Sequence, residues 1–206
     1  RRAPGFFDVV AYEGTGSAQN IPHNLGVKPE LIIVKDRDNG SQWAIQAGPL
    51  GATDRLRMPQ NGGTSSITSY WNDTEPTSTV FTVGSDTNTG TNSSYIAYLF
   101  ASLDGISKIG TYDGSSSNLD VNCGFANGAK FVLIKRTDST GDWWLFDSGR
   151  GIYPGADPVL EFNDTTAEDS STDFIDPLNS GFTVVGGNTL INNTTSGAKF
   201  LYLAIA

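Results

Sequence analysis

The sequence predicts an all-β protein made of two tandem β-sandwich repeats, jelly-roll-like in topology. The first observation is composition: 24 Gly, 20 Ser, 21 Thr and 15 Asn stand against five Glu, six Lys and one Met. Residues that favour helices are therefore scarce. The second is that β-branched and aromatic residues gather in short runs bounded by turn residues, which is typical of strands and argues against disorder. The third is an internal repeat.

The repeat appears when the chain is laid over itself with a shift of about 100 residues, a period long enough for one small domain. We therefore divide the chain into repeat 1, residues 1–102, and repeat 2, residues 103–206. Arg1 then stands where the last strand of a preceding repeat would end, so we expect the natural protein to continue upstream. The matching segments are Tyr12–Gly14 with Tyr112–Gly114, Leu31–Lys35 with Phe131–Lys135, Asp38 with Asp138, Trp43 with Trp143, Thr79–Val83 with Ser180–Val184, and Tyr95–Ala101 with Phe200–Ala206.

Each repeat contains enough short strands for a sandwich of its own. The continuous apolar run 131–134 predicts a central strand that is buried on both faces. Asp36–Gly40 has turn composition, because Asn-Gly readily adopts positive φ. We favour two separate sandwiches over one shared core. In repeat 1 the expected strands are residues 7–12, 31–35, 42–47, 56–58, 67–71, 79–83 and 94–101.

The charge of the chain limits its partners. The net charge is −9 and the isoelectric point is near 4.4, so a nucleic-acid backbone would be repelled. No basic amphipathic stretch is present, and the apolar runs are far shorter than the ~20 residues of a membrane helix. We predict neither nucleic-acid binding nor membrane insertion.

Catalytic groups are few. The single histidine, His23, and the single cysteine, Cys123, occupy the same position of different repeats, which argues against a Cys–His nucleophile pair. No zinc-ligand cluster and no nucleophile elbow is present. We therefore predict a protein that is not an enzyme and holds no cofactor. Paired carboxylates for sugar cleavage leave no local signature, so that alternative stays open.

The segment Asp36–Gly40 also begins like a calcium-binding loop. It lacks the acidic residue at the fifth position and the later glutamate that such a loop needs. A hairpin turn is the better interpretation, and we predict no metal site. A structural calcium elsewhere stays open.

The tryptophans carry more information about contacts. Trp43 and Trp143 share one repeat position, so we expect each to anchor the core of its own repeat. Trp144 does not repeat, and strand alternation places it on the same face as Phe146, opposite Trp143. One interpretation is a contact patch, for a sugar ring or another subunit. The other is that the other repeat, repeat 1, or a loop covers both side chains.

Several segments together resemble a tandem repeat domain of tailed-bacteriophage and prophage proteins. The resemblance covers essentially the whole chain as two copies. In repeat 2 the turn at His23 is degenerate, whereas Phe131–Lys135 and Trp143 are kept. The segments in repeat 1 are Arg2–Val10, Pro22–Glu30, Ile32–Lys35, Trp71–Asn72, Pro76–Phe81 and Tyr95–Ala101.

This resemblance implies a structural protein of the virion, namely a tail-fibre or spike segment that contributes to host attachment. Its partners would be other virion subunits in a homotrimer, and a glycan of the host surface. We favour the tail over the capsid. Two alternatives stay open: a capsid-decorating or head-fibre protein, and a carbohydrate-binding or carbohydrate-cleaving module.

Overall fold

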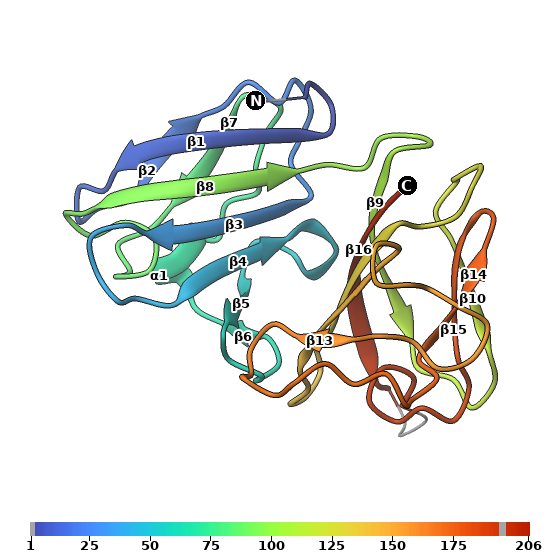
Figure 1. Ribbon diagram of the computed structural model, residues 1–206. Coiled ribbons are helices and arrows are strands. Elements are labelled where there is room, and N and C mark those ends of the chain that lie inside the picture. Colours follow the sequence, from blue (N-terminus) through green and yellow to red (C-terminus); the bar gives the residue numbers. More distant parts are fainter. Residues whose placement is uncertain (1–2, 194–196) are drawn as a thin grey trace. The chain divides into compact units, whose positions relative to one another are not determined.

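The computed structural model describes residues 3–193 and 197–206 and is almost entirely β (Figure 1). Within this part of the chain, sixteen strands form four antiparallel sheets of six, five, three and two strands. The predicted all-β fold class is therefore confirmed. Arg1 and Arg2, with which the predicted repeat 1 begins, lie outside the described residues.

The chain divides into two compact units. Unit 1 contains the residues up to Pro59 and Thr64–Ser102, and unit 2 contains Leu103–Ala206 together with Gln60–Gly63. Each unit has a hydrophobic cluster of its own. The sequence did not predict that Gln60–Gly63, which lies inside repeat 1, belongs to unit 2.

Unit 1 has a six-stranded sheet with the order β1-β8-β3-β4-β5-β6 and a two-stranded sheet, β2-β7. One core cluster joins side chains of both sheets, for example Val34 and Phe81. A 3-10 turn at Gly48–Leu50 follows β4. The other elements are β1 (Phe7–Glu13), β2 (Gln19–Pro22), β3 (Leu31–Asp36), β4 (Trp43–Ala47), β5 (Asp54–Met58), β6 (Ser65–Ser66), α1 (Thr68–Trp71), β7 (Val80–Val83) and β8 (Ser94–Phe100).

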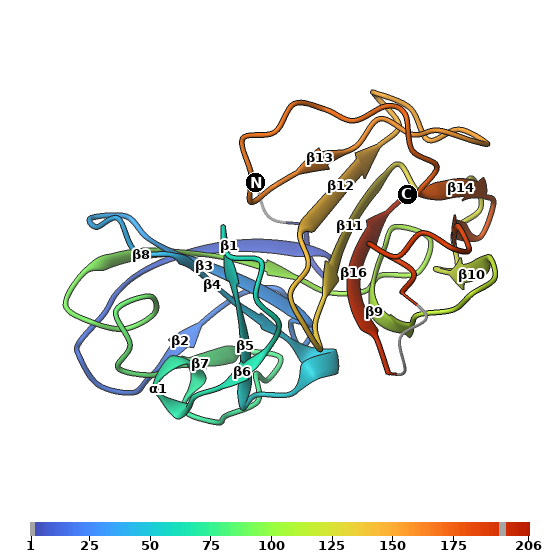
Figure 2. The same cartoon turned by 90° about the horizontal axis from the view of Figure 1, so that it is seen from below.

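Unit 2 has a five-stranded sheet with the order β13-β12-β11-β16-β9, visible side by side in Figure 2, and a three-stranded sheet, β10-β15-β14. Its core cluster again joins both sheets, for example Ile134 and Phe182. The elements are β9 (Ser107–Asp113), β10 (Leu119–Asn122), β11 (Phe131–Arg136), β12 (Trp143–Asp147), β13 (Leu160–Glu161), β14 (Ile175–Leu178), β15 (Gly181–Val184) and β16 (Lys199–Ile205).

The two units repeat one strand order. The neighbours β1-β8-β3-β4 correspond to β9-β16-β11-β12, and the pair β2-β7 corresponds to β10-β15. In the predicted run 131–134, Val132, Leu133 and Ile134 are buried and Phe131 is half-buried, and β11 lies at the centre of its five-stranded sheet. The tandem-sandwich organisation stays a prediction, which this repeated order supports.

The prediction of a strand at residues 67–71 is wrong. Thr68–Trp71 forms one turn of helix, ended by Asn72 in the left-handed conformation at φ 51°. The physical reason is that Tyr70 and Trp71, which are adjacent, are both buried in the same core. A strand would send them to opposite faces. Sequence analysis also missed the short strand β2.

The Asp36 turn is closed by its own hydrogen bonds. The buried Asp36 carboxylate accepts bonds from the side-chain amide of Asn39, from the N–H groups of Asp38 and Asn39, and from the hydroxyls of Ser41 and Ser93. Burial opposes ionisation, but these bonds outweigh it and lower the pKa of Asp36. The Asp36 carboxylate therefore stabilises the turn. In the part of the chain that the structure describes, no group of three or more His, Cys, Asp or Glu is placed to hold a metal.

In unit 2, the segment Gln60–Gly63 covers one corner of the five-stranded sheet. Its main-chain carbonyls accept bonds from two buried side chains: Trp143 Nε1 donates to Gln60 O at 3.2 Å, and Lys135 Nζ donates to Asn61 O at 3.0 Å. Lys135 Nζ also donates to the carbonyls of Arg136 and Gly141. A buried ammonium is thus held by three carbonyl oxygens, which partly replace water.

Lys135 makes the stability of unit 2 depend on pH. Burial lowers the pKa of Lys135 from 10.5 to about 8. Between these values the unfolded chain binds a proton that the folded chain does not, so the free energy of unfolding rises with pH across this window. Below it both states are protonated and the dependence vanishes. Urea unfolding of wild type and Lys135→Met at pH 7 and 9.5 should show a larger rise in wild type. Parallel pH profiles would contradict the burial of a charged Lys135.

Candidate functional site: an apolar sheet face on unit 1

The six-stranded sheet of unit 1 is apolar on both faces. Alternation in β1 sends Val10 and Tyr12 to the core and Val9 to the other face. That other face carries mostly aliphatic and aromatic side chains, whereas an antiparallel sheet with one solvated face alternates apolar with polar residues. We call it the apolar face. Its half-buried or exposed members are Phe7, Val9, Ile33, Trp43, Met58, Ile96, Tyr98 and Phe100.

Cross-strand register sets these side chains in rows. The central row runs from Val9 through Tyr98 and Ile33 to Ile45 and Leu56 over five neighbouring strands. The ends of the row differ in exposure, because Val9 is 38% exposed whereas Ile45 and Leu56 are buried. The row is a continuous apolar strip across the sheet.

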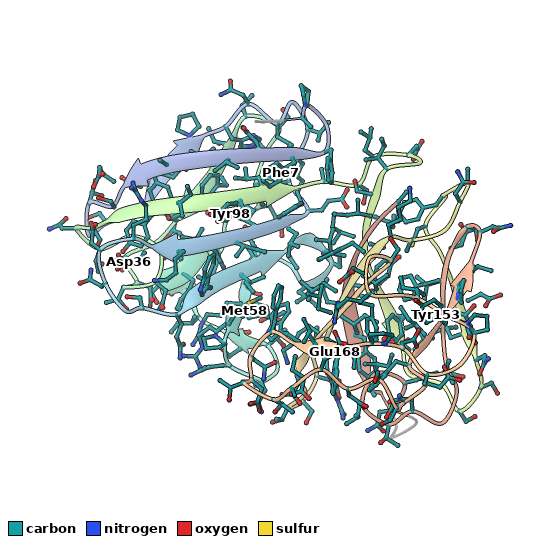
Figure 3. All side chains as sticks on the ribbon, in the orientation of Figure 1. Phe7, Asp36, Met58, Tyr98, Tyr153 and Glu168 are labelled. Carbon is teal, nitrogen blue, oxygen red and sulfur yellow. The ribbon has the colours of Figure 1, made fainter. Side chains whose placement is uncertain are left out.

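Aromatic rings lie in this row, at Tyr98, and on both sides of it, at Trp43 and at Phe7 and Phe100. The rings of Trp43 and Tyr98 are 6.3 Å apart and inclined by 27°, and those of Phe7 and Phe100 are 4.9 Å apart. Figure 3 shows Phe7, Tyr98 and Met58 spread along the sheet. Such a surface can bury area against an apolar partner or stack on a sugar ring.

The predicted contact residues Trp144 and Phe146 do not belong to this surface. Trp144 is 5% exposed and Phe146 is fully buried in the core of unit 2. Both pack on Phe174, with ring centroids 5.1 and 5.7 Å away. Of the two interpretations, the contact patch is therefore wrong. Both rings are instead covered by the segment before β14.

Repeat 1 lacks these two aromatic residues, and other large side chains supply the missing volume in its core. At the positions of Trp144 and Phe146, unit 1 has Ala44 and Gln46. The space is filled instead by the segment before β7, which places Tyr70 and the fully buried Trp71 in the core. Large side chains thus come from different elements in the two units, while each core stays filled.

The predicted core anchors also lie elsewhere. Trp43 is half-buried on the apolar face, and it is Ala44, its neighbour, that enters the core cluster. Trp143 is buried, but on the face of β12 opposite to the core, under Gln60. The two tryptophans share a position as expected, but strand parity turns both away from the core.

His23 and Cys123 have separate structural roles. His23 is buried in unit 1, where its Nδ1 accepts a bond from the Leu25 N–H, and burial lowers its pKa. Cys123 is buried in unit 2, and burial raises the pKa of its thiol to about 11. A thiol with a raised pKa is a poor nucleophile.

A hollow of about 400 Å³ in unit 1 is lined by Gly, Ala, Ser, Thr and Asn residues, among them Ser69, Asn72 and Ser85. Its lining holds no carboxylate, imidazole or ammonium that could move a proton. The apolar face is therefore the stronger candidate for function. Sequence analysis missed it, although the signal was present: in β1, β3 and β8 both alternating sets of residues are largely apolar.

The exposure of Trp43 gives a direct check of this geometry. Trp71, Trp143 and Trp144 are buried, whereas Trp43 is half-buried. We expect Trp43→Phe to remove most of the tryptophan fluorescence that acrylamide, a neutral quencher, can reach. Stern–Volmer titrations of wild type and variant measure this, with Trp143→Phe as the matched control. Equal quenching of wild type and Trp43→Phe would contradict the placement of Trp43.

A family of known proteins matches the chain over nearly its whole length. Residues 3–206 match a family described as a domain of unknown function, DUF7483. No curated protein and no solved structure matches the chain significantly. None of the helical segments in the described residues has the length and apolar character needed to cross a bilayer. Because the match spans nearly the whole sequence, the chain belongs to the DUF7483 family.

Proposed function

We propose that this chain is a structural protein of a bacteriophage particle, a segment of a tail fibre or spike that contributes to host attachment. The resemblance of the sequence to a tandem repeat domain of tailed-bacteriophage and prophage proteins supports a role in the virion. The observation that carries the proposal is the apolar face of unit 1, an extended surface suited to contact between subunits.

The partners on this face would be further copies of the same chain. Monomeric proteins rarely leave a large contiguous apolar surface in water. The row from Val9 to Ile33 is exposed or half-buried across three strands. Homo-oligomers with closed symmetry bury such surfaces by repeating one contact, and a fibre would do so as a trimer. The net charge of −9 keeps the rest of the surface soluble.

Immunogold electron microscopy of the source particles, with antibody against this chain, tests the proposal. Label confined to the tail is the expected result. Label over the head would replace the tail-fibre assignment by a capsid-decorating or head-fibre protein. Particles without label would contradict a role in the virion.

A second candidate function is carbohydrate binding, and a different feature favours it. Trp43 and Tyr98 are half-buried on the same sheet face, with their rings inclined by 27°, and a sugar ring can stack on such partly exposed aromatic rings. Fluorescence titration with host-surface glycans tests this candidate. Binding that is lost in both Trp43→Ala and Tyr98→Ala would support it, and unchanged fluorescence with every glycan would exclude it.

A further inference from the structure

In unit 2, the sheet corner at Lys135 and Trp143 binds the loop Gln60–Gly63. Lys135 pairs with Trp143 across β11 and β12, and Lys135 Nζ lies 5.9 Å from the centroid of the Trp143 ring. Both donate to successive main-chain carbonyls, those of Asn61 and Gln60. Asn61 O accepts a second bond, from the N–H of Gly141 at 2.8 Å. Three donors of the sheet corner thus recognise two adjacent carbonyls.

The loop fits closely at this corner. A Cβ atom on Gly63 would lie 2.6 Å from Thr137 O, a distance that real Cβ atoms do not show. The loop therefore approaches the β11–β12 turn through main-chain atoms. Because the contacts use carbonyls and a glycine, the corner recognises loop conformation more than side-chain chemistry.

Unit 1 has the same corner with the same residue types. The register of β3 with β4 ends at the pair Val34 and Ala44, and continuing it by one residue brings Lys35 opposite Trp43. Lys35 Nζ donates to the carbonyls of Asp36 and Asn39, which leaves one of its three donors. Among the described residues, neither that donor nor Trp43 Nε1 has an acceptor, and Trp43 is half-buried where Trp143 is buried. These are the two side-chain donors that Asn61 and Gln60 satisfy in unit 2.

We propose that the Lys35–Trp43 corner is a docking site for the loop of another repeat unit, equivalent to Gln60–Gly63, which presents two successive main-chain carbonyls. One carbonyl accepts from Lys35 Nζ and the next from Trp43 Nε1. The corner lies at one end of the apolar face, so the loop and the sheet face form one contact surface for a further unit. This inference rests on the proposed assembly of subunits. It names the groups by which another repeat unit would bind, namely two successive main-chain carbonyls.

A peptide test uses the full chain. The protein is labelled with ¹⁵N in its tryptophan indoles, and the Trp43 resonance is assigned from Trp43→Phe. The probe is an end-blocked peptide with the sequence of residues 58–65. We expect a saturable shift of the Trp43 indole N–H with a dissociation constant on the order of 1 mM, as suits two or three hydrogen bonds in a short contact. The Trp143 indole, already bonded to Gln60, should not move.

Two controls make the test specific. Lys35→Met, which keeps the length of the side chain but removes the donor, should weaken binding about tenfold. A peptide of reversed sequence has the same composition and should not bind. The proposal is overturned by a Trp43 resonance that stays in place at about tenfold higher peptide, by equal binding of the reversed peptide, or by unchanged affinity in Lys35→Met.

Failure here is distinguishable from failure of the proposed function. Tail label in microscopy with no peptide binding would keep the virion role and remove this docking site. Peptide binding without label on particles would keep the docking site and remove the virion role.

Discussion

Replacing Phe146 by Ala is expected to lower the free energy of unfolding of unit 2 by about 3–5 kcal/mol. Phe146 is fully buried, and its ring packs on Phe174 at 5.7 Å. Its removal leaves a cavity between β12 and the segment before β14, which close packing cannot easily fill. Urea unfolding measures the effect, since the transition of unit 2 should move to lower urea.

The matched control is the same repeat position in unit 1. Gln46 is 3% exposed, and neither its amide nitrogen nor its amide oxygen has a hydrogen-bond partner among the described residues. Gln46→Leu keeps the volume and removes these buried polar atoms, so we expect a gain of about 1–3 kcal/mol. Destabilisation by Gln46→Leu as large as that of Phe146→Ala would contradict the exchange of volume between the two cores.

Replacing Gly14 by Ala is expected to lower the free energy of unfolding of unit 1 by about 3 kcal/mol. A Cβ atom on Gly14 would lie 1.9 Å from the main-chain oxygen of Thr91, so the loop before β8 would have to move. Gly114 repeats this geometry in unit 2, with Asn193 O at 2.0 Å from its Cβ position. The shared Tyr-x-Gly sequence therefore marks the same close approach in both units.

Gly40→Ala is the control for Gly14→Ala. No heavy atom lies within 4 Å of the Cβ position of Gly40, and its φ is not positive. Alanine there restricts the unfolded chain and should stabilise the protein by at most about 1 kcal/mol. If the two substitutions changed the melting temperature equally, the close approach of Gly14 to Thr91 O would not be the cause of the destabilisation.

The fold class and most strands of repeat 1 could be predicted from local patterns. The segments 31–35 and 94–101 form β3 and β8 nearly as expected, since short runs of β-branched, aromatic and other apolar residues between turns favour strands. The prediction of a strand at 67–71 failed because the packing of Tyr70 and Trp71 in one core decides the conformation of this segment.

The candidate site was harder to predict. Trp143 and Trp144 are adjacent and equally large, so alternation alone does not tell which one faces the core. The answer depends on Phe174 and, in unit 1, on Trp71, residues that are distant in sequence. The role of Gln60–Gly63 rests on main-chain carbonyls, for which a sequence has no specific signal.

Sedimentation velocity of the full chain, over micromolar to submillimolar concentrations, tests most directly whether the apolar face joins subunits. Val9 and Val27 form a matched pair, 38% and 40% exposed, but only Val9 lies on the apolar face. The account predicts that wild type and Val27→Glu form the same trimer, whereas Val9→Glu shifts toward monomer. A wild-type chain that stays monomeric throughout, or equal effects of the two substitutions, would contradict it.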